Sequence, residues 1–279
     1  MLKMLAYLLN EKVVTVRDIP LTFSDETRSL PTLTDKVCAA PQCEICQNLC
    51  PTDAISAIGV DTKPIVNIDL SKCINCSLCI SGCPTGTIVR DNAVGTARAH
   101  VNDLLVSTKT TTLAASDDEV NDRSNSISSP PSSASSRPVS NTVSARNNIF
   151  KRSIACRVVS TGCSACDLEI SACTNPIFDM ERFGISIVAS PRFADVLIVT
   201  GPAPKSMHDA LKSCYMAMSE PRKVVALGTC ACSGGVHGGG YAEANGVAAI
   251  LPVDLFIPGC PPHPWSIIEG LVRLMNGNP

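Results

Sequence analysis

The sequence predicts two folded domains of different class: a small α+β domain in residues 1–90 and an α/β domain with a parallel sheet in residues 149–279. Three observations support this division. Twelve of the sixteen cysteines fall into three groups, two in the first segment and one in the second. Short apolar runs alternate with helix-like segments after residue 149. A serine-rich stretch, residues 91–148, separates the two parts.

The bulk composition fits a globular protein with one large domain or two modest ones. The chain has 279 residues, of which 45% are hydrophobic and 17% are charged. A formal net charge of −2 gives no support for a nucleic-acid or phospholipid partner. No aromatic residue lies between Phe23 and Phe150, which argues against a large conventional core in that span.

Sixteen cysteines could form a disulfide framework, but their pattern favours free thiols in a reducing compartment. Disulfide scaffolds are short secreted chains in which the cysteines are scattered. The apolar run Met1–Leu9 is short for a secretory signal, and no small-residue cleavage site follows it. No window approaches the roughly 18 consecutive apolar residues of a membrane span. Met1–Leu9 instead predicts a short helix, packed either against a partner or within the protein.

Residues 38–90 contain an internal repeat. The segment Cys43–Ile55 matches the segment Cys76–Ile88 after a shift of 33 residues (76 − 43). Cysteines, proline, threonine and isoleucine recur in register. We therefore expect two similar halves related by a pseudo-twofold axis.

The second copy of the repeat has the spacing of a bacterial ferredoxin site. In such a run the first three thiolates bind one [4Fe–4S] cubane and the fourth reaches the other cluster. Zinc is the competing metal, but zinc sites usually take two cysteine pairs rather than a four-cysteine run that occurs twice. The segment is thus predicted to be a two-cluster, ferredoxin-like domain. The run consists of Cys73, Cys76, Cys79 and Cys83, followed by Pro84.

The first copy departs from this spacing at its first ligand. Ala40 stands where a cysteine is expected, and the available thiol is Cys38, before the longer loop Ala39–Gln42. That loop could bulge and still deliver Cys38, or the cluster could have three cysteine ligands. With the fourth cysteines exchanged, one cluster would take Cys38, Cys43, Cys46 and Cys83, and the other Cys73, Cys76, Cys79 and Cys50.

The apolar runs of residues 149–279 have the length and composition of buried strands. Continuous apolar strands that alternate with helices indicate a parallel sheet, for which we predict a flavodoxin-like arrangement. Helices are expected at Ser206–Ser219 and Pro264–Met275. The expected strands are Arg157–Ser160, Ile185–Ala189, Val196–Thr200, Lys223–Leu227 and Val253–Ile257.

Three of these strands end at a glycine that is followed by a cysteine. Cys163 and Cys166 follow the first strand, Cys230 follows the fourth and Cys260 follows the fifth. Loops after the carboxyl ends of parallel strands lie at one edge of the sheet, where such folds bind ligands. We therefore expect four thiolates to meet there, enough for a third [4Fe–4S] cluster. Glycine would let the backbone approach the cluster closely.

The remaining cysteines and the histidines of the second domain are expected to have no ligand role. Cys232 stands two residues from Cys230, so its role is left open. Burial as small hydrophobic residues is expected for Cys156, Cys173, Cys214 and Cys232. Packing or solvent exposure, rather than metal binding, is expected for His208, His237 and His263.

Residues 91–148 are predicted to be a disordered linker. Between Ser124 and Asn148 there are ten serines, three prolines and no aromatic residue. Such a segment buries too little apolar surface to offset the entropy of ordering. A flexible tether of this length cannot by itself hold clusters within tunnelling range, so we expect docking surfaces, for example on a third subunit, to do so.

The motifs of the second domain resemble the small subunit of group 4, energy-converting [NiFe] hydrogenases. That subunit is homologous to the complex I subunit that carries its terminal cluster. Residues 1–90 resemble the two-cluster ferredoxin-type subunit of the same complexes, so the chain resembles a fusion of two neighbouring subunits. The stretches that carry the resemblance are Gly162–Ile170, Met180–Gly184, Ser190–Gly201, Glu220–Gly228, Cys230–Gly235 and Pro252–Pro262.

One detail of the resemblance favours the hydrogenase over complex I. Complex I relatives carry adjacent cysteines where this chain has Cys163 and Cys166, followed by Asp167–Ile170. The resemblance implies that the third group of cysteines binds the cluster proximal to a nickel–iron centre. That centre would need two cysteine pairs on a partner large subunit, so we expect no catalytic residue on this chain. Glu169 could pass protons near the subunit interface or be a solvated acid at a helix start.

The resemblance implies an oxidoreductase subunit that transfers electrons within a membrane-associated [NiFe] hydrogenase. Electrons would pass between a ferredoxin or a formate dehydrogenase, the two N-terminal clusters, the third cluster and the large subunit. Membrane subunits of the complex would hold the chain at the cytoplasmic face. A complex I-like quinone oxidoreductase and a zinc-stabilised scaffold without activity are the alternatives. Cluster type does not fix the reduction potential, so the direction of flow is left open.

Overall fold

The computed structural model describes residues 18–24, 26–38, 43–58, 65–108, 150 and 152–277. The chain divides into two units: the larger combines Met1–Lys109 with Asn148–Pro279, and the smaller is Thr110–Asn147. All described residues belong to the larger unit. The predicted helix at Met1–Leu9, the loop Ala39–Gln42 and the serine-rich stretch from Ser124 to Asn148 lie outside them.

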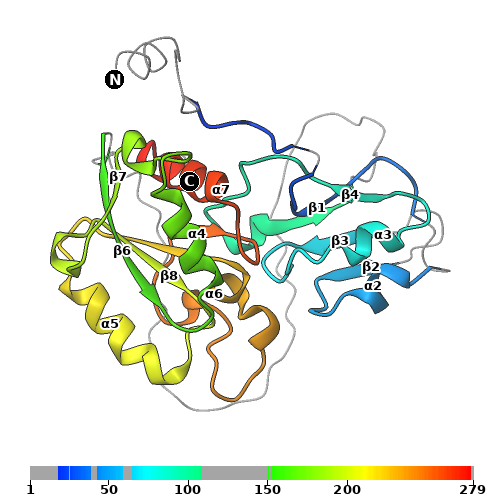
Figure 1. The fold of residues 1–279 in the computed structure, drawn as a ribbon. Helices are drawn as coiled ribbons and strands as arrows, with labels where there is room; N and C mark the ends of the chain where they lie inside the picture. The colour runs from blue at the N-terminus through cyan, green and yellow to red at the C-terminus, as the bar shows by residue number, and fades with distance from the viewer. Residues whose placement is uncertain are drawn as a thin grey trace, which may run out of the picture. The chain divides into compact units, whose positions relative to one another are not determined.

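The C-terminal part of the chain forms a five-stranded sheet in which all neighbouring strands are parallel (Figure 1). The strand order is β10-β9-β8-β6-β7. Numbered along the chain and read from β7, this is the order 2-1-3-4-5 of flavodoxin-like folds. The predicted fold class is confirmed. The strands are β6 (Ile154–Ser160), β7 (Ile185–Ile187), β8 (Val196–Thr200), β9 (Lys223–Leu227) and β10 (Leu255–Ile257).

The sheet is covered on both faces, which explains why β8 and β10 are buried along their whole length. Successive side chains of a strand point to opposite faces. Val196 and Ile198 of β8 pack in the same core as helices α4 (Ala165–Cys173) and α7 (Pro264–Met275). Leu197 and Val199 pack in a second core, together with residues of α5 (His208–Ala217) and α6 (Thr229–Ser233).

The longest helix follows the prediction closely, and the shortest ones were not predicted. α7 spans Pro264–Met275 as expected, because Pro264 favours the first helical position and the His263 side chain accepts a hydrogen bond from the Trp265 N–H at 3.2 Å. α5 falls within the predicted Ser206–Ser219. α4 and α6 have no predicted counterpart, since α6 has only five residues and α4 mixes small, acidic and apolar residues without a clear apolar face.

Single turns of 3-10 helix complete the connections. No helix among the described residues is long and apolar enough to cross a bilayer. The turns are η1 (Val101–Leu104), η2 (Met180–Phe183), η3 (Pro191–Phe193), η4 (Lys205–Met207), η5 (Gly235–His237) and η6 (Val247–Ala249).

The N-terminal part is built from two similar halves, as the internal repeat predicts. Each half has one short helix and one strand that pairs antiparallel with a second strand. The helices begin 33 residues apart (78 − 45), and so do the strands that follow them (88 − 55). The elements are β1 (Pro31–Leu33), α2 (Ile45–Leu49), β2 (Ile55–Ile58), β3 (Ile65–Asp69), α3 (Leu78–Gly82) and β4 (Ile88–Arg90).

Residues 91–108 belong to the fold, so the predicted start of the linker at residue 91 is wrong. β5 (Leu105–Ser107) joins the β2–β3 sheet by pairing antiparallel with β3. Leu104 is buried among the aliphatic residues of this small domain. The segment has no aromatic residue and no apolar run longer than three residues, so its sequence shows no clear strand although long-range pairing orders it.

The same segment joins the N-terminal part directly to the C-terminal sheet. Arg98 and Phe256 exchange two backbone hydrogen bonds, at 2.9 and 2.8 Å. Val94 and Ala97 are buried in the core that contains α7. The docking surfaces that were expected to hold the two parts together therefore include contacts within the chain itself.

Adjacent leucines test the assignment of residues 91–108 to the folded domain. Leu104 is 1% exposed and Leu105 is 52% exposed. Leu104→Ala should lower the free energy of unfolding by about 2–5 kcal/mol because it leaves a cavity. Leu105→Ala should change it by less than about 0.5 kcal/mol. Urea unfolding followed by circular dichroism measures both, and equally small effects would show that the segment does not contribute to the fold.

Candidate iron–sulfur sites

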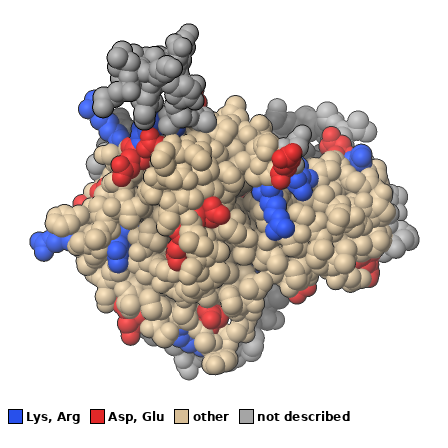
Figure 2. Space-filling model, in the orientation of Figure 1, with Lys and Arg blue, Asp and Glu red and all other residues tan. Residues whose placement is uncertain are grey.

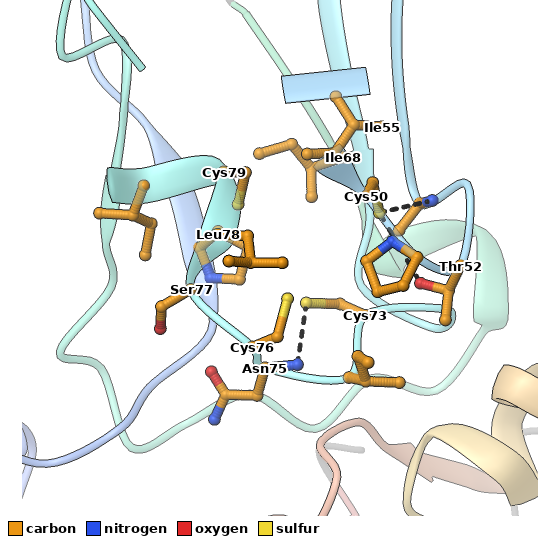
Figure 3. A pocket seen from close by; sticks show the side chains of 15 residues that line it. Cys50, Thr52, Ile55, Ile68, Cys73, Asn75, Cys76, Ser77, Leu78 and Cys79 are labelled. Carbon is orange, nitrogen blue, oxygen red and sulfur yellow. Dashed lines mark hydrogen bonds between the residues drawn. The ribbon is translucent and has the colours of Figure 1, made fainter. Parts of the chain in front are cut away.

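Four cysteines from both halves of the repeat line one pocket in the N-terminal domain (Figure 3). Their thiols face the same space, and Ile55, Ile68 and Leu78 supply part of its apolar wall. The pocket encloses about 410 Å³ of empty space, part of it open to solvent. A set of four thiols without oxygen ligands is the donor set that a [4Fe–4S] cubane takes. We call this set site 2: Cys50, Cys73, Cys76 and Cys79.

The loop before α3 is shaped to turn several thiols into site 2. Asn75 and Ser77 adopt left-handed backbone conformations, with φ of 58° and 64°. The backbone N–H of Asn75 donates to Cys73 Sγ at 3.4 Å, and that of Ala54 donates to Cys50 Sγ at 3.2 Å. Such bonds favour the thiolate form of a cysteine, which is the form that binds iron.

Burial opposes ionisation of these thiols in the absence of a cation. It raises the pKa of Cys73 to about 12 and that of Cys79 to about 11, and neighbouring thiols act in the same direction. Metal binding reverses this preference because a bound cation stabilises thiolates and releases their protons. The fit to a cationic metal core therefore comes from the set of four thiol donors and not from their pKa.

A second pocket holds the other four cysteines of this domain, with Val66 and Ile88 in its wall. Cys38 is among them, which favours four cysteine ligands over three. At Cys83, burial raises the pKa, but hydrogen bonds from the backbone at Ile88 and from Thr85 outweigh it and lower the pKa to about 7. We call this set site 1: Cys38, Cys43, Cys46 and Cys83.

The two halves exchange their fourth cysteines. Cys50 belongs to the first copy of the repeat but lies in site 2, and Cys83 belongs to the second copy but lies in site 1. A threonine two residues later accompanies each: Thr52 Oγ1 lies 3.8 Å from Cys50 Sγ, and Thr85 Oγ1 lies 3.5 Å from Cys83 Sγ. The pockets thus have the composition that the ferredoxin spacing predicts, while the role of these thiols as ligands stays a prediction.

The third group of cysteines also converges, beyond the carboxyl ends of the parallel strands. Burial is the largest cause of a rise in the pKa of Cys166 to about 12, and the thiols of the other three members add to it. The loops that carry these thiols also meet, because Gly228 lies against both the Cys166 thiol and the Gly259 carbonyl oxygen. Two members are exposed and two are half-buried, so the group lies at the surface. We call it site 3: Cys163, Cys166, Cys230 and Cys260.

One of the three predicted glycines makes room for a thiol of site 3. Gly228 has φ of 90°, and a Cβ at this position would lie 2.5 Å from Cys166 Sγ. At Gly162 and Gly259 the nearest atoms belong to Pro202 and Pro262. Those two glycines therefore permit close packing of the loops themselves. Of the three, Gly228 is the one that fits the expected role of letting the backbone approach a cluster.

The cysteines outside the sites are free thiols in or near the two cores. Cys232 is buried and donates its thiol to the Ala226 carbonyl oxygen at 3.7 Å, so it points into the sheet. Cys156 and Cys173 are buried as predicted, and Cys214 is half-buried.

The histidines of the C-terminal domain pack or face solvent. His263 caps α7 and packs edge-on against Phe23 at 4.7 Å between ring centroids, and burial lowers its pKa. His208 Nε2 lies 3.2 Å from the Ala203 carbonyl oxygen, and His237 is exposed. Glu169 lies within α4, where burial raises its pKa, and its proton-transfer role stays a prediction.

Comparison with known proteins agrees with this arrangement. Residues 163–274 match the description "NADH ubiquinone oxidoreductase, 20 Kd subunit", and residues 38–87 match a 4Fe–4S dicluster domain. An uncharacterized protein of Methanocaldococcus jannaschii is 48% identical over 125 residues, which are 44% of this chain and 84% of that protein. The chain belongs to the 20 kDa subunit family of NADH ubiquinone oxidoreductase.

Relatives that carry a functional name come from different complexes. A probable membrane-bound hydrogenase subunit of Pyrococcus furiosus is 42% identical over 41% of this chain and 69% of its own length. An NADH-quinone oxidoreductase subunit of Desulfovibrio desulfuricans is 44% identical over 42% of this chain, which spans 63% of that relative's length. A chain of an archaeal membrane-bound sulfane sulfur reductase is 29% identical over 45% of this chain and 70% of its own, with a TM-score of 0.41.

The two matched regions contain all twelve cysteines of the three sites. The dicluster match accounts for sites 1 and 2, and the 20 kDa subunit match accounts for site 3. These two matches confirm the predicted resemblance to a complex I-type subunit with a two-cluster domain.

Two glycine substitutions test whether site 3 depends on the space that Gly228 leaves for the Cys166 thiol. Gly228→Ala should displace the Cys166 thiol, so the iron content should fall by about four atoms per chain, from about twelve. Gly239→Ala is the control, because Gly239 has φ of 79° but nothing within 4 Å of an added Cβ. Iron analysis of both purified variants provides the measurement. Full iron in Gly228→Ala would contradict the assignment.

Proposed function

We propose that this protein is the iron–sulfur electron-transfer subunit of a membrane-associated [NiFe] hydrogenase complex. The observation that carries the proposal is the gathering of twelve thiols into three sets of four within one compact unit. Each set would hold one [4Fe–4S] cluster, and such clusters transfer single electrons. Three of them in one unit would provide a path for electrons through the chain.

The three sites differ in exposure in a way that suits entry and exit of electrons. Apolar side chains line part of sites 1 and 2, and each of these sites contains one buried thiol, Cys46 or Cys79. Site 3 is open, since Cys163 and Cys260 are exposed. Leu168 and Ile177, close to it along the chain, are 69% and 63% exposed. Apolar surface beside an open redox site supports a partner subunit at this position.

The face shown in Figure 2 gives no support for electrostatic attraction of a nucleic acid or an anionic membrane. Charged side chains of both signs are scattered over the face shown in Figure 2, and most of that face is uncharged. Together with the net charge of −2, this favours association through protein subunits. Attachment to the cytoplasmic face of the membrane would then come from membrane subunits of the complex.

The choice of a hydrogenase rests on the spacing of Cys163 and Cys166. Cys163 lies in the loop after β6 and Cys166 in the first turn of α4, so the two thiols reach site 3 from different elements. The resemblance to the hydrogenase form of this motif supports a large partner subunit that carries the nickel–iron centre. A ferredoxin or a formate dehydrogenase would exchange electrons with sites 1 and 2.

A subunit of a complex I-like quinone oxidoreductase is the second candidate, and the relatives named as NADH-quinone oxidoreductase subunits favour it. Co-purification of the native complex separates the two functions. A large subunit with two nickel-binding cysteine pairs and hydrogen turnover supports the hydrogenase. A large subunit without these pairs, in a complex that reduces quinone, supports the alternative.

Metal analysis of the whole chain tests the electron-transfer role itself. About twelve irons with matching sulfide per chain are expected, four for each cluster. Electron paramagnetic resonance of the reduced protein should then show three interacting centres. Zinc in place of iron would refute the role and support a structural scaffold.

Replacement of one ligand tests the path through site 3. Cys260→Ala should abolish hydrogen turnover by the complex, because site 3 loses a thiol while sites 1 and 2 keep theirs. Iron should fall from about twelve to about eight atoms per chain. Cys214→Ala, which removes a half-buried thiol outside the sites, is the matched control and should keep both turnover and iron. Turnover at the parent rate in Cys260→Ala would refute the proposed path.

A further inference from the structure

One hydroxyl group connects the backbones of sites 2 and 3. Thr229 Oγ1 donates a hydrogen bond to the carbonyl oxygen of Cys73, a member of site 2, at 2.7 Å. The same oxygen accepts a hydrogen bond from the N–H of Gly259 at 3.3 Å. Gly259 precedes Cys260, and Thr229 itself precedes Cys230, so both flank members of site 3. Thr229 is 1% exposed, which keeps water out of this contact.

We propose that Thr229 is the positioning residue that connects sites 2 and 3 electronically. The inference rests on the proposed function, since it requires clusters at both sites. Electron tunnelling is more efficient along covalent and hydrogen bonds than across an empty gap. From Cys73 to Cys230 the path is covalent except for the single hydrogen bond between the Cys73 carbonyl and the Thr229 hydroxyl. One electron passes per step: one site is oxidised by one electron, the other is reduced by one, and Thr229 keeps its proton.

Two further features hold Thr229 in position. Its backbone N–H donates to the Gly259 carbonyl oxygen at 2.9 Å, so two hydrogen bonds join Thr229 and Gly259. It is also the first residue of α6, directly after Gly228. Among the hydrogen bonds of the described residues, none joins a cysteine of site 1 to the C-terminal domain. Site 2 is therefore the site with a bonded route to site 3.

A second hydroxyl on α6 makes a similar contact without joining two sites. Ser233 Oγ donates to the carbonyl oxygen of Ser71 at 2.7 Å. Residues four positions apart lie on the same helix face, so Thr229 and Ser233 contact the Ser71–Cys73 segment together. Ser71 belongs to no site. Ser233 therefore supports the contact between the domains but lies off the bonded path, and it serves as the matched control.

The test compares three variants of the full chain loaded with its clusters. Thr229→Val keeps the branched shape but removes the hydroxyl, Thr229→Ser keeps the hydroxyl, and Ser233→Ala removes the other contact. After rapid photoreduction, freeze-quenched electron paramagnetic resonance follows how fast the electron redistributes between sites 2 and 3. Thr229→Val should slow this several-fold, while Thr229→Ser and Ser233→Ala should retain the parent rate.

Two further readouts separate an electronic role from a merely structural one. Thr229→Val and Ser233→Ala each remove a hydroxyl that donates to a carbonyl oxygen across the contact and accepts from a backbone N–H. Both should therefore lower the thermal unfolding temperature by a similar amount. The midpoint potentials of the three clusters should be equal in all variants, which excludes a change in driving force. If Thr229→Val does not assemble its clusters, Thr229→Ala takes its place in the comparison.

Failure of this inference is distinguishable from failure of the proposed function. A parent chain that binds fewer than three clusters refutes the function, whatever Thr229 does. A parent with three clusters, in which Thr229→Val transfers electrons at the parent rate, overturns the role of Thr229. Equal slowing in Ser233→Ala also overturns it, because the effect would then come from the domain contact alone.

Discussion

The contact between helix α6 and the Ser71–Cys73 segment is the constraint on which the rest of the structure depends. Three sites can act in series only if their distances are fixed, and this contact fixes sites 2 and 3 relative to each other. The paired backbone hydrogen bonds of Arg98 and Phe256 prevent rotation about that contact, because they hold the two domains at a second point. A single hydrogen bond contributes only about 0.5–1.5 kcal/mol, so it is the combination that gives a defined geometry.

The folds on either side of this contact bring thiols together by different means. In the N-terminal domain a duplicated loop exchanges its fourth cysteine with its copy, so neither pocket can form without both halves. In the C-terminal domain the parallel sheet brings the thiols together, since loops from three strands end at the same edge. The exchange produces enclosed pockets with apolar walls, whereas the sheet edge leaves site 3 open. Enclosed sites suit storage and relay within a chain, and an open site suits transfer to a partner.

The sequence predicted those features that depend on local pattern. Helix α7 has a proline start and a long amphipathic run, and strands such as β8 and β9 are largely continuous apolar segments, so their positions followed from the sequence pattern. Cysteine spacing predicted which thiols gather. Features that depend on distant partners were missed: β5 is ordered by pairing with β3, and α6 is too short to show a period. Thr229 could not be recognised either, because its role comes from a contact with Cys73, 156 positions away along the chain.

Placing both domains on one chain lowers the free energy that their contact must contribute to hold them together. The relatives match this chain over 41–44% of its length, whereas the cysteines of sites 1 and 2 lie in the separate dicluster match. Two separate proteins must offset the entropy of association, which costs several kcal/mol. Within one chain the second domain is present at an effective concentration in the millimolar range for a flexible connection. The hydrogen bonds of α6 and of Arg98, together with the buried Val94 and Ala97, are then sufficient to keep sites 2 and 3 together. Such a contact can also be optimised for electron transfer, because its residues are not needed to drive assembly.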